Sequence, residues 1–145
     1  MRSTSFAIRK ATVSALTGIT YDSVTVPVFY MEAPPSNTSK NYIIIEGLSS
    51  FDESTKSTSE VDTDLRLTIH TFSDNMNSGQ AADSIASSIL QAIYPNKQTR
   101  LNLSADSMQC SNCRLQSDNT QEYSIQGTRK YITRTITFAL KVFMY

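Results

Sequence analysis

The chain has 145 residues, which is one domain's worth of sequence and long enough to bury a single hydrophobic core. Thirteen basic side chains balance thirteen acidic ones, and this zero net charge disfavours a nucleic-acid-binding module, which normally carries a basic excess. No apolar run approaches the roughly 20 residues that cross a bilayer, and the start lacks an apolar signal core, so we expect an intracellular chain without membrane contact.

The first predicted element is a helix over residues Ser5–Leu16. Phe6, Val13 and Leu16 fall roughly on one side of it, which predicts that they face the core. A nearby hydroxyl side chain suits the helix start, and Gly18 suits the left-handed backbone position just after the end. We therefore expect a moderately amphipathic helix with defined ends.

A strand with a proline at its start is predicted next. Residues 21–24 are typical of a short turn, and Val26–Tyr30 has the composition of a β-strand. Proline has no N–H group to donate to a neighbouring strand, so Pro27 indicates a sheet edge or a strand entry. The prolines within Ala33–Asn37 then interrupt regular structure.

The middle of the chain predicts two strands joined by a polar hairpin. Tyr42–Leu48 is apolar on both faces, which suits a central strand covered on at least one side. Val61–Phe72 alternates between apolar and polar residues, so one face is buried and the other meets solvent or a partner. The hydroxyl- and charge-rich segment Ser49–Glu60 between them predicts an extended hairpin arm rather than a linker.

Residues Ser78–Ile93 predict an amphipathic helix, which Tyr94–Asn96 terminates. Its apolar side chains recur at helical spacing and are Ala82, Ile85, Ala86, Ile89 and Ile93. At about 1.5 Å per residue such a helix is roughly 24 Å long, enough to cross a sheet whose strands lie about 4.8 Å apart. We therefore expect it to cover one face of the sheet.

The last third of the chain is rich in strand signals. Residues Ser107–Gln116 alternate weakly, and turns are predicted at Asp118–Thr120 and at Gly127. Lys130–Met144 alternates with a period of two over its whole length and predicts a second long strand. Paired with Val61–Phe72, this strand would form the centre of the sheet.

Candidate catalytic and metal-binding residues are few. His70 is the only histidine and lies in mid-strand, away from the geometry of a Ser-His-Asp site, so we interpret it as a polar-face side chain. Cys110 and Cys113 have a C-x-x-C spacing, but a zinc site needs about four ligands and a redox pair opens a helix. On a strand their thiols are expected to point to opposite faces, which leaves a metal shared between subunits as the alternative. Two cysteines cannot staple a chain of this size, which favours a reduced compartment.

An acidic stretch surrounds the hairpin arm and consists of Asp52, Glu53, Glu60, Asp62 and Asp64. Paired carboxylates serve acid–base chemistry or bind hard cations, yet this spacing matches neither an EF-hand nor a nuclease motif. A solvated hairpin is the simpler interpretation. The sequence also lacks a phosphate loop, a nucleophile elbow and a metalloprotease motif, so we predict no enzyme, no cofactor and no metal site.

The order of these patterns resembles the tail terminator, or tail completion, proteins of long-tailed bacteriophages. The likeness covers nearly the whole chain and is carried by five segments, namely Val24–Val28, Tyr42–Gly47, Asp64–Ser73, Gly79–Ile93 and Arg134–Phe138. The resemblance implies a single α+β domain over residues 1–145, with the hairpin arm at about residues 49–60. It also implies a mixed, largely antiparallel sheet of four to five strands with two helices packed on one face.

The resemblance further implies a structural virion protein that forms a hexameric ring on the last ring of the tail tube. Such a ring stops tube polymerisation and offers its other surface to the head–tail connector, while DNA passes through the channel without specific binding. The expected partners are further copies of the chain, the tail tube protein and the connector or neck protein. The expected location is the virion tail or neck, and the host cytoplasm during assembly.

Alternative functions stay open at this point. A head-completion or neck adaptor protein belongs to the same structural class, whereas a small enzyme or a nucleic-acid-binding module is disfavoured. We expect the arm to order on assembly and to contact other subunits or the tube. The candidate contact residues are aromatic or charged and lie on or beside the arm and the last strand: Phe51, Asp52, Glu53, Lys56, Glu60, Asp62, Arg129, Lys130 and Arg134.

Overall fold

The computed structural model describes residues 3–46, 50–52, 60–73, 78–97, 101–126 and 129–145. Two α-helices, α1 (Thr4–Leu16) and α2 (Ser78–Ile93), pack on one face of a mixed sheet. Two short 3-10 turns are η1 (Pro95–Lys97) and η2 (Ser104–Asp106). The strands in chain order are β1 (Thr20–Tyr21), β2 (Val24–Thr25), β3 (Val28–Tyr30), β4 (Asn41–Ile45), β5 (Ser50–Asp52), β6 (Glu60–Ser73), β7 (Met108–Gln126) and β8 (Arg129–Met144).

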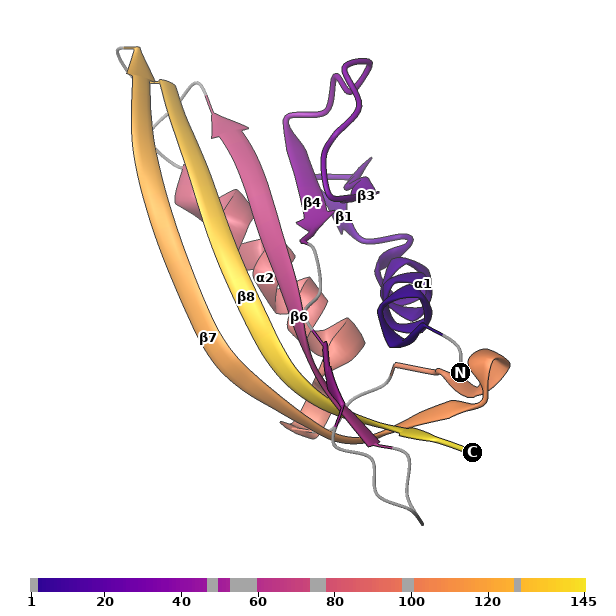
Figure 1. Cartoon of the computed structure of the whole chain (residues 1–145). Helices are drawn as coiled ribbons and strands as arrows, with labels where there is room; N and C mark the ends of the chain where they lie inside the picture. Colours follow the sequence, from indigo (N-terminus) through magenta and orange to yellow (C-terminus); the bar gives the residue numbers. More distant parts are fainter. Residues whose placement is uncertain (1–2, 47–49, 53–59, 74–77, 98–100, 127–128) are drawn as a thin grey trace.

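The main sheet has the strand order β3-β4-β6-β8-β7, and β5 also pairs with β6. Strands β3 and β4 are parallel, and the other described pairs are antiparallel, which confirms the expected α+β fold. With β5 the sheet has six strands, one more than expected. Figure 1 shows β6, β7 and β8 as long curved strands side by side, with α2 lying across them.

The hydrophobic core fills the space between the sheet and the two helices. The predicted apolar face of α2 is confirmed, since its five residues are each at most 1% exposed. Strands β6 and β8 pair without interruption along their length, as expected for the sheet centre, and alternate residues point into the core. No helix in the described part of the chain covers the opposite side of the sheet, which we call the open face.

Helix α1 has the expected ends but a different buried face. The Ser3 side chain accepts a hydrogen bond from the Phe6 N–H at 3.3 Å, and Gly18 has a φ of +96°. The expectation that Phe6 faces the core is wrong, because this side chain is 49% exposed. Thr12 is fully buried instead, and its hydroxyl donates to the Ile8 carbonyl at 2.7 Å. A threonine whose hydroxyl is hydrogen-bonded therefore takes a core position, and Phe6 lies outside the buried face of Thr4, Ala7, Ile8, Thr12 and Leu16.

A two-strand hairpin replaces the simple turn expected after α1. Strands β1 and β2 pair across Asp22 and Ser23, whose φ values are 52° and 65°. Two consecutive left-handed residues form the turn type whose twist matches that of paired strands. The chain then passes Pro27 into β3, which is the three-residue edge strand that this proline predicts.

The prediction of a turn at Asp118–Thr120 is wrong, because these residues lie inside β7. Strand β7 has 19 residues and pairs with β8 as far as Gln126 opposite Arg129. The side chains of the expected turn are turn-forming types, yet each residue has a partner in β8. The Asp118 carboxylate accepts hydrogen bonds from Arg134 instead of capping a turn.

The predicted hairpin arm is described at its base. Strand β5 pairs with β6 from Ser50 opposite Thr63 to Asp52 opposite Val61, so the two sides of the arm are antiparallel, as a hairpin requires. Residues 53–59 lie outside the described residues, and so does Gly127.

Candidate interaction surfaces

Ring side chains cross the open face of the sheet from strand β3 to strand β7. Neighbouring ring centroids lie between 4.6 and 6.1 Å apart. Four of the five contacts are stacked, with interplanar angles of 11–25°, and the contact at the β3 end is edge to face. We call these residues the aromatic row: Phe29, Tyr42, His70, Tyr131, Phe72 and Tyr123.

The strand register places these rings on one face. Tyr42 lies opposite His70, Phe72 lies opposite Tyr131, and Tyr131 lies opposite Tyr123. Residues directly opposite each other on paired strands share a face, with Cβ atoms about 4.5–5.5 Å apart. The alternate residues of these strands belong to the core. The row therefore follows from the two-residue period of three neighbouring strand pairs.

His70 lies at the middle of the aromatic row, between the rings of Tyr42 and Tyr131. Its Nδ1 atom forms a hydrogen bond with the Tyr131 hydroxyl. Burial lowers the pKa of His70, and the charge of the nearby Glu46 carboxylate opposes this effect. The pKa of Tyr131 is raised, first by burial and then by its tyrosine neighbours Tyr42 and Tyr123. Both rings are therefore uncharged near neutral pH, and the row is a neutral platform.

The interpretation of His70 as a polar-face side chain on a half-exposed strand is confirmed. Its described neighbours are rings and hydroxyl groups, and Thr68 donates a hydrogen bond to Glu46 at 2.8 Å on the same face. Ser73 ends β6, and Asp74 lies outside the described residues. The described surroundings of His70 thus suit contact with a partner better than proton transfer to a nucleophile.

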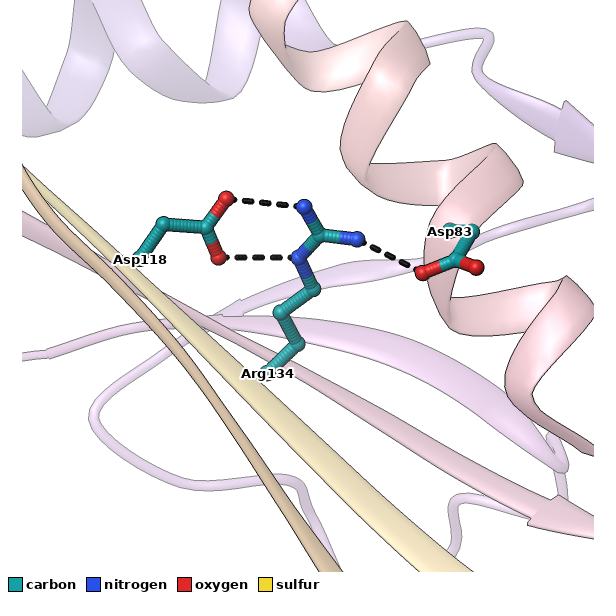
Figure 2. A network of polar contacts seen from close by, with 3 residues as sticks. All are labelled: Asp83, Asp118 and Arg134. Carbon is teal, nitrogen blue, oxygen red and sulfur yellow. Dashed lines mark hydrogen bonds and ion pairs between the residues drawn. The ribbon is translucent and has the colours of Figure 1, made fainter.

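Arg134 joins three elements on the helix-covered side of the sheet (Figure 2). Its guanidinium forms a bidentate pair with Asp118 of β7, with N···O distances of 2.9 and 2.7 Å. A third N–H donates to Asp83 of α2 at 2.8 Å. The hydrogen bond to Asp118 is the largest cause that raises the pKa of Arg134. The Arg134 side chain is 19% exposed, so the guanidinium of this predicted interface residue is engaged within its own chain.

A second exposed patch lies where α1 meets the end of β3. We call it the cationic patch, and it consists of Phe6, Arg9, Tyr30 and Met31. The central carbon of the Arg9 guanidinium lies 5.2 Å from the Phe6 ring centroid and 4.8 Å from that of Tyr30. The other three side chains are 40–57% exposed. A cation between aromatic rings beside an exposed methionine has the composition of a protein interface core.

Carboxylates at the start of β6 lie on the open face. The Glu60 and Asp62 carboxylates are 4.0 and 3.8 Å from the Lys141 ammonium of β8. All three side chains are 26–41% exposed, so these ion pairs contribute little to stability. In the described part of the chain, no group of three or more His, Cys, Asp or Glu residues could hold a metal ion.

The remaining predicted contact residues lie at opposite ends of the long central strands. Phe51 and Asp52 belong to β5 beside the start of β6, whereas β8 begins with Arg129 and Lys130 beside the end of β6. The fold therefore does not bring the acidic arm base of one copy to the basic residues of the same copy. Two predicted contact residues lie outside the described part of the chain: Glu53 and Lys56.

The two cysteines lie on the same side of β7, contrary to expectation. Cys110 pairs with Val142 and Cys113 pairs with Leu140, because a bulge between Cys110 and Asn112 shifts the alternation of side chains. The two cysteines form no disulfide with each other, and Cys113 is buried whereas Cys110 is half-buried. Burial raises the pKa of the Cys110 thiol, which makes it a poor nucleophile at neutral pH.

A hollow of about 400 Å³ lies between the β1–β2 hairpin and residues 38–41. Asp22 and Lys40 are the charged residues of its lining, which contains neither histidine nor cysteine. The hollow therefore holds no nucleophile with an imidazole base beside it. Across the described residues, no helix is both long enough and apolar enough to traverse a bilayer.

Sequence reasoning missed both the aromatic row and the cationic patch. A usable signal existed for the row, since Tyr42, His70, Phe72 and Tyr131 occupy positions where an alternating strand normally has small polar side chains. No comparable signal existed for the cationic patch, because it depends on how α1 docks beside β3.

The chain matches no family model and no curated protein in sequence. Its structure is similar to a chain of the solved structure "Virion of native gene transfer agent (GTA) particle", with a TM-score of 0.57. The two sequences are 14% identical, and the match covers 79% of this chain and 78% of that chain. At this identity the likeness shows a common fold.

Proposed function

We propose that this chain is a structural virion protein that forms a hexameric ring on the end of the tail tube. The ring stops tube polymerisation and supplies the surface to which the head–tail connector binds. The observation that carries the proposal is the fold likeness to a chain of a gene transfer agent virion, at a TM-score of 0.57. The element order that resembles tail terminator proteins supports the same assignment, because the sheet, both helices and the arm base have the expected arrangement.

A tail terminator needs unlike contact surfaces rather than a reaction pocket. A tube grows because each ring exposes a face that recruits the next ring. The cap must match that face on one side and present a different surface on the other. The aromatic row on the open face and the cationic patch beside α1 are exposed surfaces on opposite sides of one sheet, and both are available for contacts with other protein copies. This arrangement supports a role in assembly.

The ends of the long strands supply further contacts in this proposal. The arm base, with Phe51, Asp52, Glu60 and Asp62, lies at one end of β6, and the start of β8 lies at the other. The acidic end and the basic end lie too far apart on one copy to contact each other. Each end can therefore contact only another copy or another protein. We therefore assign these ends to contacts with neighbouring subunits and with the tube or the connector.

The charge balance suits a channel that lets DNA pass. A strongly basic lining would hold the duplex through its phosphates, and this chain has no net positive charge. DNA is thus expected to cross the ring without specific binding.

A head-completion or neck adaptor protein is the second candidate, since it too requires two unlike surfaces. A pull-down with purified tail tube protein and, separately, with connector protein distinguishes the two. Retention of tube protein supports the terminator, whereas retention of connector protein alone supports the adaptor.

Native mass spectrometry tests the ring directly. The purified chain at high concentration, alone and with tail tube protein, is expected to give a closed ring of six copies. A chain that stays monomeric in both conditions contradicts the proposal.

A further inference from the structure

Five of the eight large apolar side chains that are exposed in the described part of the chain gather in two patches. Phe6, Tyr30 and Met31 of the cationic patch are 49%, 40% and 57% exposed. In the aromatic row Phe72 and Tyr123 are 39% and 48% exposed. Clustered apolar side chains of this size on a folded surface indicate contact sites.

The two patches lie on opposite sides of the sheet. Tyr30 pairs in register with Ile45, a fully buried core residue, and therefore lies on the helix-covered side, where it meets Arg9 of α1. The rings of the aromatic row occupy the alternate positions and lie on the open face. One copy cannot bring its own two patches together, but the patch of one copy can meet the row of the next. Contacts of this head-to-tail kind close into rings when the rotation between copies is right.

One charge on each surface can form a complementary pair. The Arg9 guanidinium lies over two rings and forms no ion pair within the described residues, whereas its neighbour Lys10 is paired with Asp106 at 2.8 Å. The Glu46 carboxylate on the open face accepts a hydrogen bond from Thr68. Glu46 forms no ion pair with any residue of the described segments, although Arg66 lies opposite it across β4 and β6. Arg9 on the patch and Glu46 beside the row are thus opposite charges, and neither forms an ion pair within the described residues.

The ring chemistry of the row also suits a guanidinium partner. Its tyrosine and phenylalanine faces attract cations, and an arginine over such a face is a common interface contact. His70 at the centre of the row carries no charge near neutral pH and therefore does not repel Arg9.

We propose that the cationic patch of one copy docks on the aromatic row of a second copy of the same chain, with Arg9 placed against Glu46. This inference rests on the ring of the proposed function and names the surfaces that build it. The tail tube protein is the competing occupant of either surface, and the experiment below separates the two.

Two exposed-surface variants provide the test. The patch variant carries Arg9→Glu and Met31→Ser, and the row variant carries Phe72→Ser and Tyr123→Ser. All four side chains are at least partly exposed, so both variants should melt close to the wild type. Ser14→Glu, on an exposed position of α1, is the control and should keep the ring.

Native mass spectrometry should show that each variant alone is monomeric. A 1:1 mixture should give heterodimers, because the intact patch of the row variant meets the intact row of the patch variant. Combining Arg9→Glu with Glu46→Arg should restore rings that Arg9→Glu alone loses. Rings that persist in both variants, or a mixture that remains monomeric, overturn the inference.

The outcomes separate this inference from the proposed function. A wild-type chain that forms no ring, with or without tail tube protein, refutes the function itself. If the wild type and both variants form rings, but either variant no longer binds tail tube protein, only the assignment of these surfaces to the ring is refuted. The surfaces then belong to the contact with the tube.

Discussion

Replacing Arg134 by glutamine removes the ion pairs that link β8 to Asp118 of β7 and to Asp83 of α2. The guanidinium makes two short hydrogen bonds to Asp118 and one to Asp83. A hydrogen bond to a charged group contributes about 1.5–3 kcal/mol, and loss of one partner leaves a carboxylate that is partly cut off from water. The Asp118 side chain is 26% exposed, so water compensates part of the loss. We expect the free energy of unfolding to fall by about 1–2.5 kcal/mol.

The two acidic partners should contribute unequally. Asp83 is 77% exposed, so its pair with Arg134 is screened by solvent and should contribute less than about 0.5 kcal/mol. The bidentate Asp118 pair is more enclosed and should contribute about 1–2 kcal/mol. Asp83→Asn should therefore be almost neutral, whereas Asp118→Asn should be clearly destabilising.

Urea unfolding of the single and double variants measures these differences as a pair of double-mutant cycles. The coupling between Arg134 and Asp118 should persist at about 0.5 M salt, since enclosed pairs are screened less than exposed ones. Equal destabilisation by Asp83→Asn and Asp118→Asn, or a coupling to Asp118 that vanishes in salt, would refute the reasoning from exposure.

Three further predictions concern the core, the open face and the thiols. Ile89→Ala, at a fully buried position of α2, should lower the free energy of unfolding by about 2–5 kcal/mol. Gln91→Ala, on the exposed side of the same helix, should change it by less than about 0.5 kcal/mol. Similar values for both variants would contradict the assigned buried face of the helix. Burial lowers the pKa of His70 below its usual value of about 6.5, so the unfolded chain binds the proton more tightly than the folded chain. The free energy of unfolding should therefore decrease as the pH falls from about 7 through the folded pKa of His70. His70→Gln should flatten that loss in urea titrations at a series of pH values, and an unchanged slope would count against a neutral His70. Since burial raises the pKa of Cys110, alkylation followed by mass spectrometry should label it much faster after unfolding than in the native chain at neutral pH, and equal rates would contradict its burial.

Elements with a clear hydrophobic period were predictable from the sequence. Helix α2 has the predicted bounds and the predicted buried residues, and β6 and β8 pair at the sheet centre as expected. Their apolar residues recur at 3.6 or 2 positions because one face of each element is buried. The edge position of β3 was also predictable, because Pro27 has no backbone N–H to donate to a second neighbouring strand.

The wrong predictions concern segments in which polar residues occupy buried or strand positions. Thr12 occupies a core position because its hydroxyl bonds to a carbonyl one turn earlier, which no hydropathy pattern shows. Strand β7 is mostly polar and is held by backbone pairing to β8, so it lacks the alternation that identifies a strand. A bulge reversed the expected faces of the cysteine pair, because one extra residue changes the side of every residue beyond it.

The candidate surfaces were less predictable than the fold. Arg134 finds Asp118 and Asp83 at separations of 16 and 51 residues, so its engagement within the chain depends on tertiary packing. The aromatic row draws its rings from five strands, and it becomes a single surface only when the strand register is known. Local sequence patterns contain neither relationship.

Tail length in particles assembled without this protein tests the central claim most directly. If the chain caps the tube, electron micrographs of such particles should show overlong tails without heads, and supplying the wild-type chain should restore a uniform length. Tails of normal length joined to heads in its absence would contradict the account.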